Sequence, residues 1–111
     1  MNENDKVERE PRFPISADVR LVNDAEDYAE LAVIDLSRSG LGIDGLLHFP
    51  PETRVRIDFP SGQVRTGTTR WRDTFTSGVA FDVPMTESDL GGLWLSLRNK
   101  PRFARKIRSA S

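Results

Sequence analysis

Segment 53–59 alternates between apolar and charged side chains, a pattern typical of a β-strand with one buried face. The positions predicted to face inward are Val55, Ile57 and Phe59, and those predicted to face outward are Arg54, Arg56 and Asp58. The turn-forming sequence Pro60-Ser61-Gly62 follows directly. The segment is therefore predicted to be a short strand that ends in a turn.

Five further segments have the same extended character, each short and bounded by turn-forming residues. They span residues 18–21, 28–36, 40–44, 63–72 and 78–83. Segment 28–36 is apolar enough that we expect burial on much of both its faces. In the last segment, Val79, Phe81 and Val83 are expected to share one face. Six short strands at fairly regular spacing predict a mainly β fold, namely a small barrel.

A helix is predicted after Pro84, which ends the β region. Residues 86–89 (Thr-Glu-Ser-Asp) supply a capping side chain and acids near the positive end of the helix dipole. Apolar residues then recur at helical spacing, at Leu90, Leu93, Trp94 and Leu97. Asn99 and Pro101 then predict the end of the helix. We expect one amphipathic helix that covers a mouth or side of the barrel, with Trp94 packed inward.

The composition removes several classes of function. The 111 residues fit a single domain, and they include no cysteine and one histidine, His48. Disulfides, thiolate metal sites and cysteine nucleophiles are excluded, and a lone histidine gives no reason to expect a metal site. We expect no enzyme, because no Gly-rich phosphate loop precedes the helix. No apolar run approaches the ~20 residues of a membrane span and no secretory signal is present, so we expect a cytoplasmic protein.

Charge divides the chain into three parts. Residues 1–30 hold nine acids against four basic residues, whereas the stretch from Arg98 onward holds six basic residues and no acid. We predict a flexible N-terminal arm at residues 1–11, a barrel with its helix at 12–99, and a basic tail at 100–111. The barrel region is close to charge balance and its aromatic residues fall mostly at inward positions, so DNA or RNA binding is not expected.

A polar cluster, Asp35-Leu36-Ser37-Arg38-Ser39-Gly40, lies where one predicted strand passes to the next. Asp35 can accept hydrogen bonds from amide edges, Ser37 can donate or accept, and Gly40 lets a ligand approach the backbone. This set suits a polar, planar ligand that carries phosphates. The alternative is a plain hairpin turn, because turns select Asp, Ser and Gly for their own backbone reasons.

Four stretches together resemble the PilZ family of bacterial cyclic di-GMP receptors, over most of residues 8–97. They are an N-terminal Arg with Phe13-Pro14-Ile15, the Asp35-x-Ser37-x-x-Gly40-Leu41-Gly42 stretch, Arg70-Trp71, and Gly78-Val79-Ala80-Phe81. The resemblance implies a six-stranded antiparallel β-barrel with a C-terminal α-helix, which agrees with the strand and helix count above.

The resemblance also implies a ligand site made from the arm and the polar cluster. The family has an Arg-x-x-x-Arg motif on the arm; here Glu8 stands at the first Arg, Arg9 follows it, and Arg12 matches the second. A carboxylate repels phosphate, whereas a guanidinium binds it bidentately and stacks on a base.

The implied roles can be assigned to individual residues. Arg9 and Arg12 would hold phosphates and stack on guanine, and Arg38 would be an additional cation. Asp35 would accept from guanine N–H groups, Ser37 would hydrogen-bond, and Gly40 would leave room.

Two functions stay open. The first is a cyclic di-GMP receptor or adaptor, without a further cofactor, whose arm orders on the ligand and so changes a surface that an effector protein reads. The second is a degenerate PilZ adaptor that has lost the ligand and acts by protein–protein interaction, for which Glu8 is the main argument.

Overall fold

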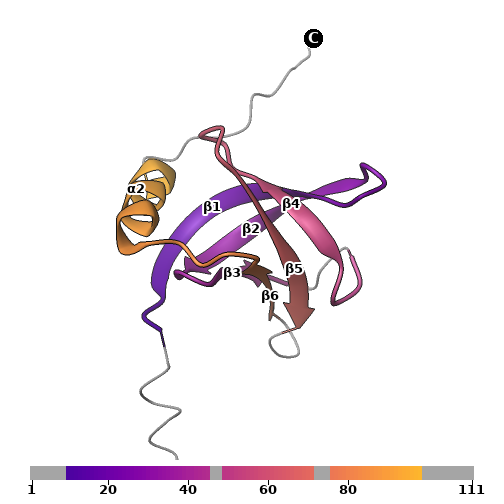
Figure 1. Ribbon diagram of the computed structural model, residues 1–111, viewed down its shortest axis with the longest axis horizontal. Helices are drawn as coiled ribbons and strands as arrows, with labels where there is room; N and C mark the ends of the chain where they lie inside the picture. Colours follow the sequence, from indigo (N-terminus) through magenta and orange to yellow (C-terminus); the bar gives the residue numbers. More distant parts are fainter. Residues whose placement is uncertain (1–9, 46–48, 72–75, 99–111) are drawn as a thin grey trace, which may run out of the picture.

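A computed structural model of the chain describes residues 10–45, 49–71 and 76–98. Its elements are β1 (Phe13–Val22), β2 (Tyr28–Leu36), β3 (Gly40–Asp44), β4 (Arg54–Asp58), β5 (Val64–Trp71), β6 (Thr76–Phe81) and α2 (Glu87–Arg98) (Figure 1). His48, Arg9 and the predicted basic tail lie outside the described residues.

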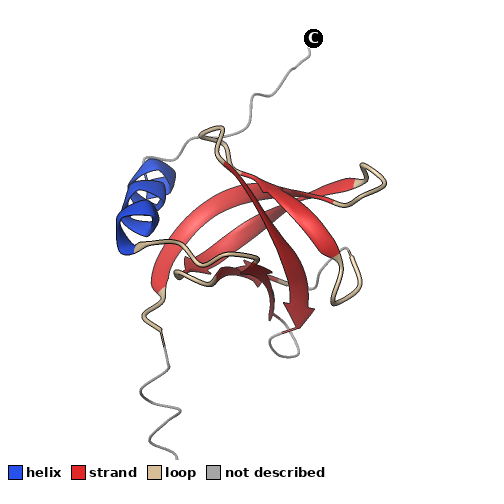
Figure 2. Cartoon of the chain, viewed as in Figure 1, coloured by secondary structure: helices blue, strands red, loops and turns tan. Residues whose placement is uncertain are grey.

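The six strands close into an antiparallel barrel in the order β1-β2-β3-β6-β5-β4, with β4 pairing back to β1. The mainly β barrel with one C-terminal helix, expected from the sequence, is thus confirmed (Figure 2). Closure gives every strand a partner on each side over part of its length, which removes the exposed sheet edges of an open sheet.

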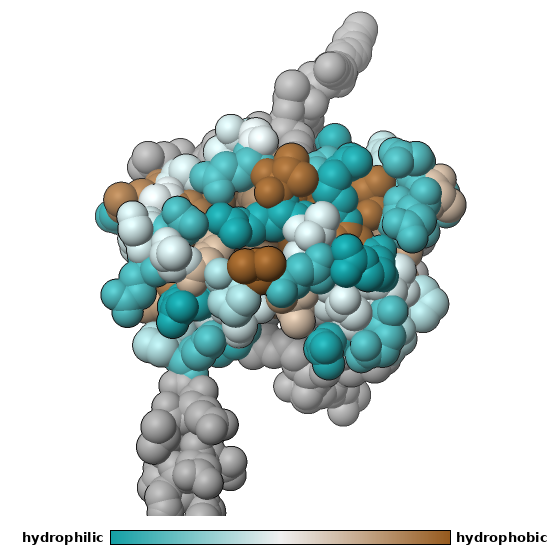
Figure 3. Space-filling view, in the orientation of Figure 1, coloured by the Kyte–Doolittle hydropathy of each residue, from teal (hydrophilic) through white to brown (hydrophobic). Residues whose placement is uncertain are grey.

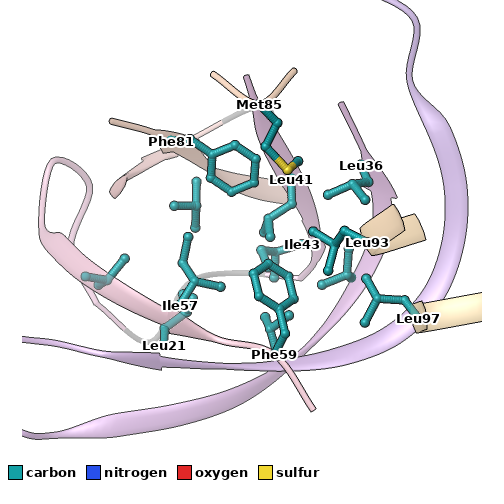
Figure 4. Close-up of a cluster of buried hydrophobic side chains, with 14 of the residues drawn as sticks. Leu21, Leu36, Leu41, Ile43, Ile57, Phe59, Phe81, Met85, Leu93 and Leu97 are labelled. Atoms are coloured by element: carbon teal, nitrogen blue, oxygen red, sulfur yellow. The ribbon is translucent and has the colours of Figure 1, made fainter. Parts of the chain in front are cut away.

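The core fills the barrel and continues to the helix. Val55, Ile57 and Phe59 are buried, as the alternation in this segment predicted. Leu93 and Leu97 of α2 enter the same cluster from the helix side, whereas Leu21 and Ile57 lie on its opposite side (Figure 4). The helix therefore closes the core of the barrel.

The helix starts at the predicted place. The hydroxyl of Thr86 accepts a hydrogen bond from the backbone N–H of Asp89 at 3.0 Å, which is the geometry of an N-cap. Glu87 and Asp89 lie in the first turn, where their charges favour the positive end of the helix dipole.

Two predictions about side-chain positions were wrong. Ala32 and Ile34 of β2 are exposed, so this strand is buried on one face and not on both. Val83 is 69% exposed because β6 ends at Phe81, and alternation does not continue past the end of a strand. Trp94 packs against the core, as predicted, although it is only half-buried. Its indole Nε1–H donates to the carbonyl of Pro14 at 3.2 Å. Exposed hydrophobic residues form separate patches in a largely hydrophilic surface (Figure 3).

Strand β1 is longer than the predicted segment 18–21, since it begins at Phe13 and includes Pro14. Proline lacks the backbone N–H that a strand paired on both sides would need, but this end of β1 is paired on one side only. Pairing with β4 is confined to residues 20–22, so Pro14 pairs with β2 alone. Trp94 of α2 covers the other side of this end of the strand.

Candidate functional site

The register of β1 against β2 brings the chain before β1 beside the turn between β2 and β3. Phe13 pairs with Leu36 and Pro14 with Asp35. Residues 10–12, called the β1 entry below, directly precede Phe13 and so lie near this turn. The side chain of Glu10 contacts Ser39 and that of Arg12 contacts Asp35. A register shift between Pro14 and Ala17 is what sets this alignment.

Arg12 and Asp35 form an ion pair. The guanidinium Nε and Nη2 of Arg12 lie 3.1 and 2.8 Å from Oδ1 of Asp35. The two residues stand diagonally across the β1–β2 pair, a distance that a long side chain spans. Their side chains remain 37% and 19% exposed, so the pair is accessible from solvent and worth at most about 1 kcal/mol.

A second register shift directs Asp35 toward Arg12. It lies between Val33 and Asp35 in the pairing of β2 with β3. Unbroken alternation would put Asp35 on the inward face with Val33. With the shift, Leu36 is the next buried residue, and Asp35 lies at the surface. A bulge that re-aims a side chain in this way is common beside binding sites.

Ser37 and Gly40 hold the β2–β3 turn together. The backbone N–H of Ser37 donates to the Gly40 carbonyl at 2.8 Å, and the Ser37 hydroxyl donates to the same oxygen at 3.3 Å. Ser37 is fully buried. A Cβ on Gly40 would lie 2.2 Å from the carbonyl oxygen of Val79, so only glycine allows this approach of β3 to β6. Both residues therefore have a structural role in the turn.

Arg38 connects the turn to the segment that leads into α2. Its Nε donates to the carbonyl of Met85 at 2.7 Å, and the Met85 N–H donates to the Arg38 carbonyl at 2.8 Å. Met85 is itself buried. The two bonds fix the turn against the start of the helix.

Glu10 and Ser39 complete the cluster and were not predicted. Oε1 of Glu10 accepts from the Ser39 hydroxyl at 2.7 Å and from the Ser39 N–H at 3.3 Å. The hydroxyl bond is the main reason that the pKa of Glu10 lies below its ordinary value, and the nearby charge of Arg38 adds to it. One sequence signal was available: Glu10 precedes Arg12 by two residues, a spacing that predicts both side chains on one side wherever the chain is extended.

The PilZ domain family profile matches residues 6–103. The chain belongs to the PilZ family. PilZ proteins are receptors for cyclic di-GMP and act as ligand-binding or adaptor modules. No curated protein matched the chain. Within the described residues, no helix is long and apolar enough to cross a membrane, and no group of three or more metal-ligating side chains converges.

The predicted site residues that the structure describes lie close together. Arg12 and Asp35 contact each other, and Ser37, Arg38 and Gly40 form the adjoining turn. Arg9 lies outside the described residues.

A groove of about 570 Å³ adjoins this cluster in the PilZ domain, between the β1 entry and α2. It is lined by Glu10, Pro11, Phe13, Arg38, Glu87, Leu90, Gly91 and Trp94. Figure 1 shows the helix beside the first part of β1, where the groove lies. Phe13 is 40% exposed here, and the guanidinium of Arg98 lies 5.2 Å from the centre of the Trp94 ring. One wall of the groove thus belongs to the β1 entry.

Proposed function

We propose that this PilZ domain binds cyclic di-GMP where the β1 entry meets the β2–β3 turn, and that binding rearranges the β1 entry. The observation that carries the proposal is the contact of Arg12 with Asp35 at 2.8 Å. Membership of a cyclic di-GMP receptor family supports it. Both residues also match motif positions in the sequence comparison with that family made above.

Each residue of the pair has a chemical partner on the ligand. A guanidinium offers two parallel N–H donors that match a phosphate, and it can also stack on a base. A carboxylate accepts from the N–H groups on a guanine edge. Binding would replace the Arg12–Asp35 contact with one contact from Arg12 to a phosphate or base and one from Asp35 to a guanine edge. The exchange costs little, since an exposed ion pair contributes at most about 1 kcal/mol.

Ser37 and Gly40 would act mainly through the shape of the turn. Their observed contacts hold the turn in place, and the Ser37 side chain is buried in the ligand-free protein. Arg38 would add positive charge beside the ligand while it keeps its bond to Met85. Arg9 would supply a second guanidinium from the arm, in place of the arginine that Glu8 replaces.

The groove is the surface that an effector protein would read. Glu10, Pro11 and Phe13 form one wall, and the first turns of α2 form the other. When Arg12 turns to a phosphate, the neighbouring Glu10 and Pro11 move with it, and the groove changes shape. The ligand undergoes no reaction, so the domain works as an adaptor.

The second candidate is an adaptor that does not bind the nucleotide. Glu8 in the arm motif favours it, because a carboxylate at this position repels phosphate. Isothermal titration of the purified protein with cyclic di-GMP decides between the two, with GTP and cyclic di-AMP as controls. Saturable binding of cyclic di-GMP alone supports the receptor. Absence of heat and of a shift in melting temperature at high micromolar ligand supports the adaptor.

A further inference from the structure

Ser39 offers two hydrogen-bond donors to a single acceptor. Its hydroxyl lies 2.7 Å and its backbone N–H 3.3 Å from the same oxygen, Oε1 of Glu10. Arg38 precedes Ser39 in the turn, and its charge favours the ionised form of the Glu10 carboxylate. Two converging donors beside a cation form a position that favours an anion.

We propose that Glu10 occupies this anion position in the ligand-free protein and has to leave it before a phosphate group can bind there. Glu10 is then an internal competitor that sets the affinity of the domain for its ligand. The inference rests on the proposed function, since it names a phosphate of cyclic di-GMP as the group that replaces the carboxylate.

The competition follows from chemistry and from chain connection. Carboxylate and phosphate oxygens are both charged acceptors, so they seek the same donors. Glu10 is attached to the barrel through only two residues before β1, which gives its carboxylate a high effective concentration at Ser39. The observed affinity for the ligand equals the intrinsic affinity multiplied by the fraction of molecules in which Glu10 has left this position.

The depressed pKa of Glu10 agrees with this picture. Its first cause is the hydrogen bond from the Ser39 hydroxyl, and the Ser39 N–H, the Ser37 hydroxyl and the charge of Arg38 act in the same direction. The contact therefore favours the charged carboxylate, which is the form that resembles a phosphate.

The test is isothermal titration of the full chain with cyclic di-GMP in the variants Glu10→Ala and Asp89→Ala. Both remove one carboxylate, but that of Asp89 lies near Arg65, 3.7 Å away, and does not contact Ser39. We expect Glu10→Ala to bind about three- to tenfold more tightly than wild type and Asp89→Ala to change little. Equal tightening in both variants would indicate a general charge effect and would overturn the proposal.

A double-mutant cycle with Ser39→Ala separates competition at Ser39 from other effects of Glu10. We expect Glu10→Ala to tighten binding in the wild-type background and not in the Ser39→Ala background. If wild type binds cyclic di-GMP and Glu10→Ala binds it equally or more weakly, the proposal that Glu10 competes with the ligand is refuted. The receptor function then still stands. If neither wild type nor Glu10→Ala binds, the receptor function is refuted and the competitor with it. Binding by Glu10→Ala alone would support both.

Discussion

Arg38 and Met85 are joined by two hydrogen bonds that run in opposite directions. Arg38 donates through its side chain to the Met85 carbonyl, and Met85 donates through its backbone to the Arg38 carbonyl. The residues are far apart in sequence, one in the β2–β3 turn and the other just before α2. These bonds therefore connect the turn directly to the start of the helix, which forms one wall of the groove.

Replacing Arg38 with alanine should destabilise the fold through this connection. The guanidinium is a charged donor to the carbonyl of a buried residue, so its loss should lower the free energy of unfolding by about 1–2 kcal/mol. Urea denaturation measures the change. Arg70→Ala is the matched control, because Arg70 is exposed and lies 3.7 Å from Glu52; it should change stability by less than about 0.5 kcal/mol. Equal losses in both variants would contradict the structural role of Arg38.

Removing either member of the Arg12–Asp35 pair should weaken ligand binding. We expect Arg12→Ala and Asp35→Ala each to reduce the affinity for cyclic di-GMP at least about tenfold, because each loses a charged contact to the ligand. Arg56→Ala is the control: it also breaks an exposed Arg–Asp pair, at 2.7 Å from Asp58, but at the other end of β1. Unchanged melting temperatures would show that the barrel persists. Similar affinities in all three variants would refute the site.

Glycine at position 40 is required by packing, with or without ligand. Gly40→Ala places a methyl group 2.2 Å from the carbonyl oxygen of Val79, a backbone atom that cannot turn aside. We expect a loss of about 1–3 kcal/mol, measured by urea denaturation. Gly91→Ala tests the opposite case, because nothing lies within 4 Å of the added Cβ and the residue is in a helix. That variant should gain about 0.5–1 kcal/mol.

Acidification should release the contact between Glu10 and Ser39. The pKa of Glu10 is lowered in the folded protein, so the contact stabilises the fold above the unfolded pKa and is lost as the pH falls through the folded pKa. We expect the Ser39 amide resonance to shift in this range, below the ordinary titration of glutamate. Glu10→Gln should abolish that shift while the rest of the spectrum stays the same. Persistence of the shift in Glu10→Gln would assign it to another carboxylate.

Local pattern accounts for most of the fold. Alternation in segment 53–59 and Thr86 at the helix start were correctly interpreted because each depends only on residues close in sequence. Trp94 packs against the core, as predicted, but its hydrogen bond to Pro14 was not predicted because Pro14 lies 80 positions earlier. The sequence motif predicts Arg12 and Asp35 as ligand residues, but it did not predict that they contact each other.

The sequence by itself determined the strands, the barrel, the capped helix and the PilZ motif, since side-chain periodicity and turn chemistry are local properties. The tertiary structure decided how strands align, and this depends on two register shifts, between Pro14 and Ala17 and between Val33 and Asp35. One extra residue in a strand reverses the side to which the next side chains point. Whether the pairing accommodates such a residue depends on strands that are distant in sequence. For that reason, only the folded chain brings Glu10 to Ser39 and turns Asp35 toward Arg12.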